Sequence, residues 1–185
     1  MKFVIPAIIT FFFITLIFPY SANAQRRDQL TEMETELVRE AQEISLRTQV
    51  FIKAIDRRFL VLNNDTSKAK QVEKDLETWG ELPKGTRAQL LLDIEKILQE
   101  AVDNIDNLAE RDAKNELLPK ALHTLADASA KLLPQLKSQL DKTNTETEKG
   151  AILGAIDLCN QIIEASAKVP KVESKNKKKK DNSQD

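Results

Sequence analysis

The chain has 185 residues, of which 31% are charged and 5% aromatic, and its 28 Lys and Arg nearly balance its 29 Asp and Glu. A single cysteine excludes an internal disulfide bond, so the burial of apolar side chains must supply the stability. The small number of glycines, four, and the abundance of Leu, Ala, Lys, Glu and Gln are typical of a helical protein.

The first residues have the features of a secretory signal peptide. Lys2 precedes the apolar stretch Val4–Phe18, and Ala22-Asn23-Ala24 fits the small-x-small pattern that signal peptidase reads. An uncleaved membrane anchor is the alternative, but the apolar stretch is shorter than the roughly 20 residues that span a bilayer. We therefore expect residues 1–24 to be removed before Gln25 and the mature protein to be exported, to the periplasm or beyond the cell.

Apolar residues at helical spacing predict four main helices between residues 25 and 170. The first is expected from Thr31 to Leu62, beginning with a Thr31–Glu34 capping box. The second is expected to start after Gly85, with Thr86 and Gln89 as its cap. The third should begin near Asn115.

Two prolines lie within the third predicted helix. Pro119 is tolerated in its first turn, whereas Pro134 predicts a kink or break because it removes a backbone donor. The fourth helix is expected to start at Thr143 or Thr145 and to be the most buried element. Its apolar face is expected to contain Ala151, Ile152, Ala155, Ile156, Leu158, Cys159, Ile162 and Ile163.

The segment between the first two main helices is polar, and the spacing of Val72, Leu76 and Trp79 predicts a short helix from Ser67 to Thr78. No segment alternates with the period of a strand. We therefore predict an all-α fold, an up-down antiparallel four-helix bundle with this short extra helix in the first connection. The mature chain then divides into a helical domain, residues 25–170, and a lysine-rich tail, residues 171–185, which is too polar to fold on its own.

Gly80 and Gly85 have the spacing of the two glycines in a phosphate-binding loop, G-x-x-x-x-G-K-[ST]. Thr86 occupies the position of the essential lysine, however, and no apolar strand precedes the loop. We therefore interpret the stretch as a corner between helices and expect no nucleotide there. Gly80 would end the short helix, Pro83 would prevent its continuation, and Gly85 would let the chain turn into the next helix.

Trp79, the only tryptophan, lies beside this corner and is interpreted as a plug, with a contact to a partner as the alternative. Arg57 and Arg58 form a basic edge near the end of the first helix. The helix dipole favours positive charges at this end of a helix. A contact with an anion or with a partner is the alternative interpretation.

The remaining polar residues give no specific site. A solvent-exposed acidic face is predicted on the second helix, and the weak binding of a divalent cation is its alternative. His123 is interpreted as half of a surface pair with Asp127, and Cys159 as a buried, inert thiol. The acidic face comprises Asp93, Glu100, Asp103, Asp106 and Glu110.

No motif for a metal, haem or nucleotide is complete, so we expect no cofactor. The tail contains six lysines and three acidic residues, and we expect weak electrostatic contact with anionic surfaces; nucleic acid is the least expected partner of an exported protein. The possible partner contacts are Trp79, Arg57, Arg58, Lys177, Lys178, Lys179 and Lys180.

The function expected from these features is that of a non-catalytic binding or structural module of the cell envelope, with an unknown envelope partner. The alternative is an enzyme, or a metal- or cofactor-binding bundle, that uses scattered carboxylates. A catalytic bundle should bury two or more acidic residues that face each other. An interaction module should instead expose an apolar patch.

Overall fold

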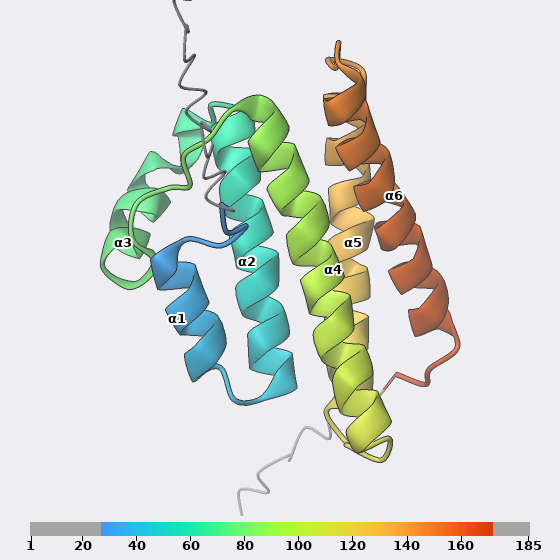
Figure 1. Cartoon of the computed structure of the whole chain (residues 1–185). Coiled ribbons are helices and arrows are strands. Elements are labelled where there is room, and N and C mark those ends of the chain that lie inside the picture. Colours follow the sequence, from blue (N-terminus) through green and yellow to red (C-terminus); the bar gives the residue numbers. More distant parts are fainter. Residues whose placement is uncertain (1–26, 172–185) are drawn as a thin grey trace, which may run out of the picture.

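The computed structural model describes residues 27–171, and this part of the chain contains helices and no strand (Figure 1). The helices are α1 (Glu32–Glu40), α2 (Ile44–Leu62), α3 (Ala69–Trp79), α4 (Arg87–Arg111), α5 (Leu118–Leu140) and α6 (Glu146–Ala167), and a 3-10 turn, Thr66–Lys68, precedes α3. The predicted all-α class is therefore confirmed. Between residues 27 and 171, none of the helices combines the length and apolar character needed to cross a bilayer.

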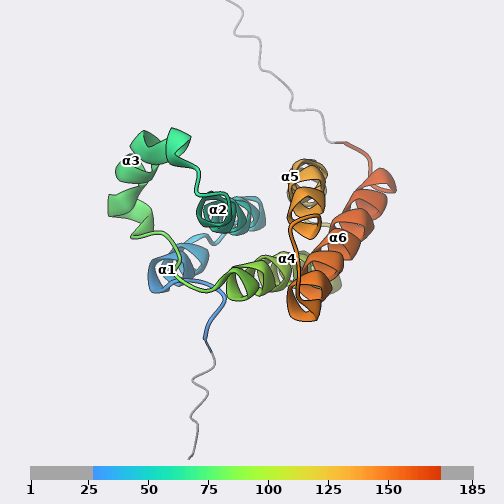
Figure 2. The ribbon, with the colours of Figure 1, turned by 90° about the horizontal axis from the view of Figure 1, so that it is seen from above.

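The first predicted helix is two helices, so the expectation of one continuous element from Thr31 to Leu62 is wrong. Its start is as predicted, because Thr31 and Glu34 form both bonds of a capping box. The backbone of Ala41 leaves the helical region, at ψ 83°. The chain then folds back, so that α1 lies alongside α2 (Figure 2). Tertiary contacts explain the turn between α1 and α2, because it brings the Glu34 carboxylate to Arg57 and Arg58 of α2.

The other boundaries follow their local signals closely. Thr86 caps α4 through a capping box with Gln89, and the hydroxyl of Thr145 accepts from the backbone N–H of Glu148 at the start of α6. Pro119 lies in the first turn of α5 as predicted. Of the kink or break predicted at Pro134, the break does not occur: α5 continues to Leu140, and Leu132 and Leu136 are buried on either side of the proline.

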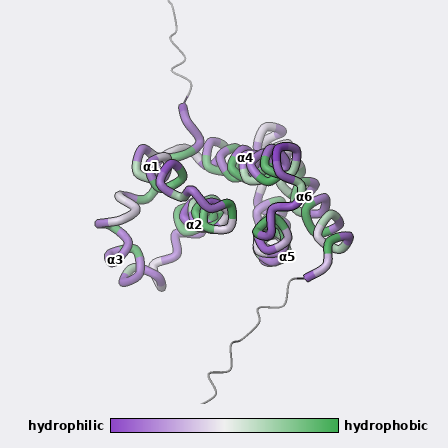
Figure 3. Tube along the Cα trace, turned by 90° about the horizontal axis from the view of Figure 1, so that it is seen from below, coloured by the Kyte–Doolittle hydropathy of each residue, from purple (hydrophilic) through white to green (hydrophobic). Residues whose placement is uncertain are grey.

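Four helices surround the main core, and α1 and α3 lie outside it on the side of α2 (Figure 2). Each of α4 and α5 packs on both α2 and α6, whereas α4 and α5 contact each other less. Hydrophobic positions recur along α2, α4, α5 and α6 (Figure 3). The fully buried apolar side chains include Phe51, Ile55, Ile94, Ile97, Leu98, Leu125, Leu136 and Ile152.

The expectation that the fourth predicted helix is the most buried is wrong. On α6 the buried residues are Ala151, Ile152, Ala155, Cys159, Ile162 and Ser166, whereas α2 buries nine of its 19 residues. Within the predicted apolar face, Ile152 is fully buried but Ile156 is only partly buried. The face is narrower than predicted because α6 packs on two neighbours, α4 and α5, and its other side remains open.

Candidate functional site

The most unusual feature of the interior is a cluster of charged side chains, called here the arginine cluster: Arg27, Glu34, Arg57, Arg58 and Asp93. At its centre, the Oε1 atom of Glu34 accepts from Arg57 Nε at 3.0 Å and from an Arg58 Nη at 2.7 Å. All three residues are at most 1% exposed. The Oε2 atom of Glu34 also accepts from the backbone N–H of Thr31, so one carboxylate caps α1 and binds α1 to α2.

The second carboxylate of the cluster is Asp93 of α4, which is 4% exposed. The guanidinium of Arg27 donates to both of its oxygens, at 3.1 and 2.8 Å, and Arg58 Nε lies 3.9 Å from the nearer one. Burial raises the pKa of Asp93, and the positive charges of Arg27 and Arg58 oppose that shift. This pair fastens the first described residues of the chain to α4.

Arg57 connects the cluster to the corner between α3 and α4 that contains Gly80 and Gly85. One of its terminal nitrogens donates to the carbonyl oxygens of Trp79, Gly80 and Glu81, at 3.1, 3.2 and 2.5 Å. The guanidinium of Arg57 also lies 5.7 Å from the centre of the Trp79 ring, and Lys53 Nζ lies 5.9 Å from the same ring centre. Both distances are within the range of a cation–π contact. Arg57 therefore places a positive charge at the C-terminal end of α3, where the helix dipole favours it.

The corner itself is confirmed in most details. Gly80 follows α3 directly with a φ of 64°, a conformation that disfavours any residue with a Cβ. Gly85 does not have a positive φ, so the turn at this position does not need the left-handed backbone conformation that favours glycine. A Cβ at Gly85 would instead lie 3.0 Å from Arg27 Nη2, so that glycine makes room for the arginine that binds Asp93.

The arginine cluster corrects the prediction of a basic edge. Arg57 and Arg58 are not at the surface, and their guanidinium groups are occupied by Glu34 and by backbone carbonyls. Asp93 is likewise buried and does not belong to an exposed acidic face. Chemically, the cluster holds three cations against two carboxylates, and arginines separate Glu34 from Asp93. Such an arrangement holds segments together, because most of its charged groups are paired with one another; Arg58 Nε, 3.9 Å from Asp93, makes no hydrogen bond to the described residues.

A second polar junction lies where four helix ends meet. Arg87, the first residue of α4, donates to the side-chain oxygen of Gln139 at 2.6 Å, to its backbone oxygen at 3.0 Å and to Glu148 at 3.2 Å. Gln139 in turn donates to the side chain of Asn63 at 2.7 Å. The ends of α2 and α5 therefore meet the starts of α4 and α6 at one end of the molecule.

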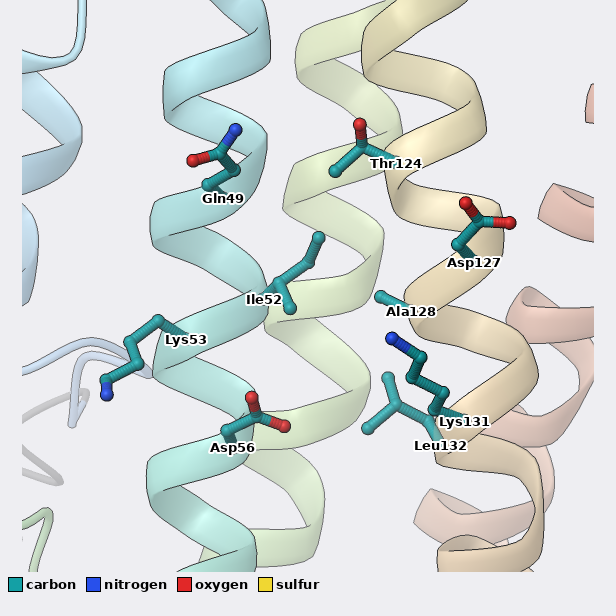
Figure 4. Close-up of a pocket in the computed structure, with 9 residues that line it drawn as sticks. All are labelled: Gln49, Ile52, Lys53, Asp56, Thr124, Asp127, Ala128, Lys131 and Leu132. Atoms are coloured by element: carbon teal, nitrogen blue, oxygen red, sulfur yellow. The ribbon is translucent and has the colours of Figure 1, made fainter. Parts of the chain in front are cut away.

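Grooves are open on the surface of the described helices, and two of them lie between main helices. The first, of about 390 Å³, lies between α2 and α5 (Figure 4). Ile52 and Leu132 supply apolar surface, and Asp56 on one wall and Lys131 on the other point into the space between the helices. Burial raises the pKa of Asp56, although Lys68, Lys53 and Lys131 oppose this. Lys53 points away from the groove and forms an ion pair with Asp75 of α3 at 2.6 Å.

The second groove, called here the α4–α6 groove, has these two helices as its walls and α5 as its floor. It opens beyond the point where Gly154 of α6 lies against the side chain of Glu95 of α4, a contact that leaves no space for a Cβ. Its wider end has a volume of about 570 Å³. Apolar side chains line most of this space: Ile105, Ala109, Ala113, Leu118, Pro119, Leu122, Ala165 and Val169.

The single histidine and the single cysteine lie apart from these features. His123 Nε2 donates to the backbone oxygen of Val169 at 3.0 Å and not to Asp127, so the predicted surface pair is wrong. Cys159 is fully buried, and burial raises its pKa to about 11. The prediction that this thiol is buried is confirmed. Between residues 27 and 171, no three His, Cys, Asp or Glu side chains are arranged to hold a metal ion.

Other predictions concern residues outside those described. Residues 1–24, expected to be the signal peptide, and Lys177, Lys178, Lys179 and Lys180 of the tail lie there. Trp79 is described and is partly exposed, with its ring held by Lys53 and Arg57.

The arginine cluster itself was not predicted. A signal was present, because Arg58 occurs seven residues after Phe51 and three after Ile55, in the apolar stripe of α2. Glu34, in contrast, looks in the sequence like an ordinary capping residue. No family model, curated protein or solved structure matches this chain.

Proposed function

We propose that this protein is an exported, non-catalytic module that binds a partner in the cell envelope. The observation that carries this proposal is the α4–α6 groove, whose wider end has a volume of about 570 Å³ and is lined mostly by apolar side chains. The buried carboxylates Glu34 and Asp93 lie against arginines and not against each other, which is the arrangement of a structural cluster. We further infer that α2, α4, α5 and α6 form the up-down bundle expected from the sequence.

Export is supported by the sequence of residues 1–24 and is tested by the mass of the mature protein. We expect a species that begins at Gln25 in the periplasmic or extracellular fraction. Retention of Lys2 to Ala24 in the mature species would contradict both the cleavage and the location.

Binding through the groove is tested by photo-cross-linking in the native envelope. A photoreactive residue is placed at Ala109, which lines the groove, and in a second variant at Leu46, which is 50% exposed on α2. We expect a discrete cross-linked product from position 109 and none of the same mass from position 46. Equal products from both positions, or none from position 109, would contradict a function that depends on this groove.

The basic tail is proposed to add a weak, charge-dependent contact with anionic surfaces. Each lysine near an anionic membrane contributes about 1 kcal/mol at best, and the effect fades beyond roughly 8 Å at physiological salt. Deletion of residues 171–185 should leave the helix content unchanged and reduce binding to anionic liposomes at low salt. Binding that survives both the deletion and high salt would show that the helical domain is the membrane-binding surface.

A further inference from the structure

The α4–α6 groove has the length and shape of a site for a helix. Its wider end and its middle part share Ile105, Asp106, Leu122 and Ala165, so the two are continuous. On the α4 wall the lining extends from Gln99 to Ala109, and Lys114 lies beyond the end of that helix. Eleven residues of helix measure about 16 Å, which corresponds to about three turns of an occupant lying along the groove.

The residues that line the groove and its edges include more acidic than basic side chains. On the α4 wall Asp106 lines the groove and is exposed, and Asp103 and Glu110 of the same helix are also exposed. Asp157 and Glu164 are exposed on α6. Glu116 also lines the wider end. The nearby lysines are Lys114, Lys120 and Lys171, and Lys168 is held by Glu164 in an ion pair of 2.8 Å.

Together, the apolar floor and the acidic edges select one class of occupant. An amphipathic helix places its apolar side chains in such a groove and its polar face toward the edges, so here the polar face must be basic. An anionic lipid is disfavoured because its head group would face the acidic edges. The chain's own tail is disfavoured because Val172 is the only apolar residue after Lys171.

We propose that the α4–α6 groove binds a basic amphipathic helix of a partner protein. Apolar side chains of that helix contact Ile105, Leu118 and Leu122, and its lysines or arginines lie near Asp106 and Glu110. This inference rests on the proposed function and specifies the chemical class of the partner.

The test measures the binding of three labelled 15-residue peptides to the mature full-length chain by fluorescence anisotropy. The first peptide contains Leu and Lys with its leucines on one helical face, the second replaces Lys by Glu, and the third has the composition of the first without an apolar face. We expect binding of the first peptide only. Equal binding of the first and third peptides would show non-specific charge attraction and overturn the proposal.

Two matched variants locate the binding. Asp106→Asn with Glu110→Gln should weaken binding of the Leu/Lys peptide by about threefold to tenfold, the size expected for two exposed ion pairs. Glu73→Gln with Glu77→Gln removes the same charge from exposed positions of α3 and should leave binding unchanged. Helix content, measured by circular dichroism, should be the same in both. An equal loss in both variants would overturn the proposal.

A third variant, Ala109→Arg, fills the groove and should abolish binding of the Leu/Lys peptide. If this variant instead dissolves a dimer or removes binding to anionic vesicles, then a second copy or a lipid is the occupant and the proposal is wrong. Failure of the peptide to bind, with a cross-linked product still obtained from position 109, would reject the basic helix and leave the proposed function standing.

Discussion

Glu34 and Arg57 are 23 residues apart in the chain, yet Arg57 Nε donates to Glu34 Oε1 over 3.0 Å. In one continuous helix the same separation would place them about 35 Å apart. The ion pair therefore requires the turn between α1 and α2, and the apolar periodicity that runs through this turn does not reveal it.

Glu34→Gln tests how much this contact stabilises the protein. A glutamine at this position can still cap Thr31, so the substitution removes the charge, leaves Arg57 buried without a carboxylate and leaves Arg58 with only Asp93, at 3.9 Å. Loss of one partner of a buried pair costs about 3–5 kcal/mol of unfolding free energy, measurable by urea denaturation. The control is Glu36→Gln, in an exposed pair with Arg39, which should cost less than about 1 kcal/mol. Equal effects would show that the arginine cluster does not stabilise the fold.

Substitution of Gly80, Gly85 and Gly150 by alanine should change the stability of the protein in different ways, because their surroundings differ. Gly80→Ala places a Cβ at positive φ and should cost about 1–2 kcal/mol. Gly150→Ala in α6 meets no atom within 4 Å and should stabilise by about 0.5–1 kcal/mol, because it reduces the entropy of the unfolded chain. Gly85→Ala should weaken the Arg27–Asp93 pair by displacing Arg27. Thermal melts provide the measurement, and millimolar ATP should shift none of them; a rise of several degrees would contradict the corner interpretation.

The two isoleucines of α6 test the observed position of the core. Ile152→Ala should cost about 2–5 kcal/mol, because Ile152 is fully buried and its truncation leaves a cavity. Ile156→Ala should cost less than half as much, since that side chain is only partly buried. The reverse order in urea denaturation would mean that the side of α6 that carries Ile156, and not the side that carries Ile152, faces the core.

Asp56 and Asp75 should show opposite dependences of stability on pH. Burial raises the pKa of Asp56 in the folded state above 3.8. The contribution of the protonated Asp56 to the free energy of unfolding is therefore fully present below pH 3.8 and is lost as the pH rises through the folded-state pKa. Asp56→Asn should therefore raise the melting temperature at pH 7, and this gain should disappear below pH 3.8.

The hydrogen bond from Lys53 instead lowers the pKa of Asp75, so that contribution is present above pH 3.8 and lost at lower pH. Asp75→Asn should lower the melting temperature at pH 7 and have no effect in strong acid. The measurement is the melting temperature of Asp56→Asn and Asp75→Asn at pH 3 and pH 7. Shifts of the same sign in both variants at pH 7 would contradict the opposite pKa directions of Asp56 and Asp75.

Local signals predicted much of the fold. Thr31, Thr86 and Thr145 mark helix starts because each side chain satisfies a nearby backbone N–H, an interaction that needs no distant partner. The arginine cluster depends on residues up to 66 positions apart, and no local pattern encodes such a pairing. Pro134 shows the same limit, because tertiary packing holds α5 together where the local rule predicts a break.

The fold-back of α1 also sets an order of assembly. A chain is made from its N-terminus, so Glu34 emerges before the arginines that neutralise it, and Arg27 emerges long before Asp93. In contrast, α5 and α6 are consecutive and pack on each other as soon as both exist. The first described residues to be synthesised are therefore fixed only after the beginning of α4 has been made, and any pause before that point leaves Arg27 without its carboxylate.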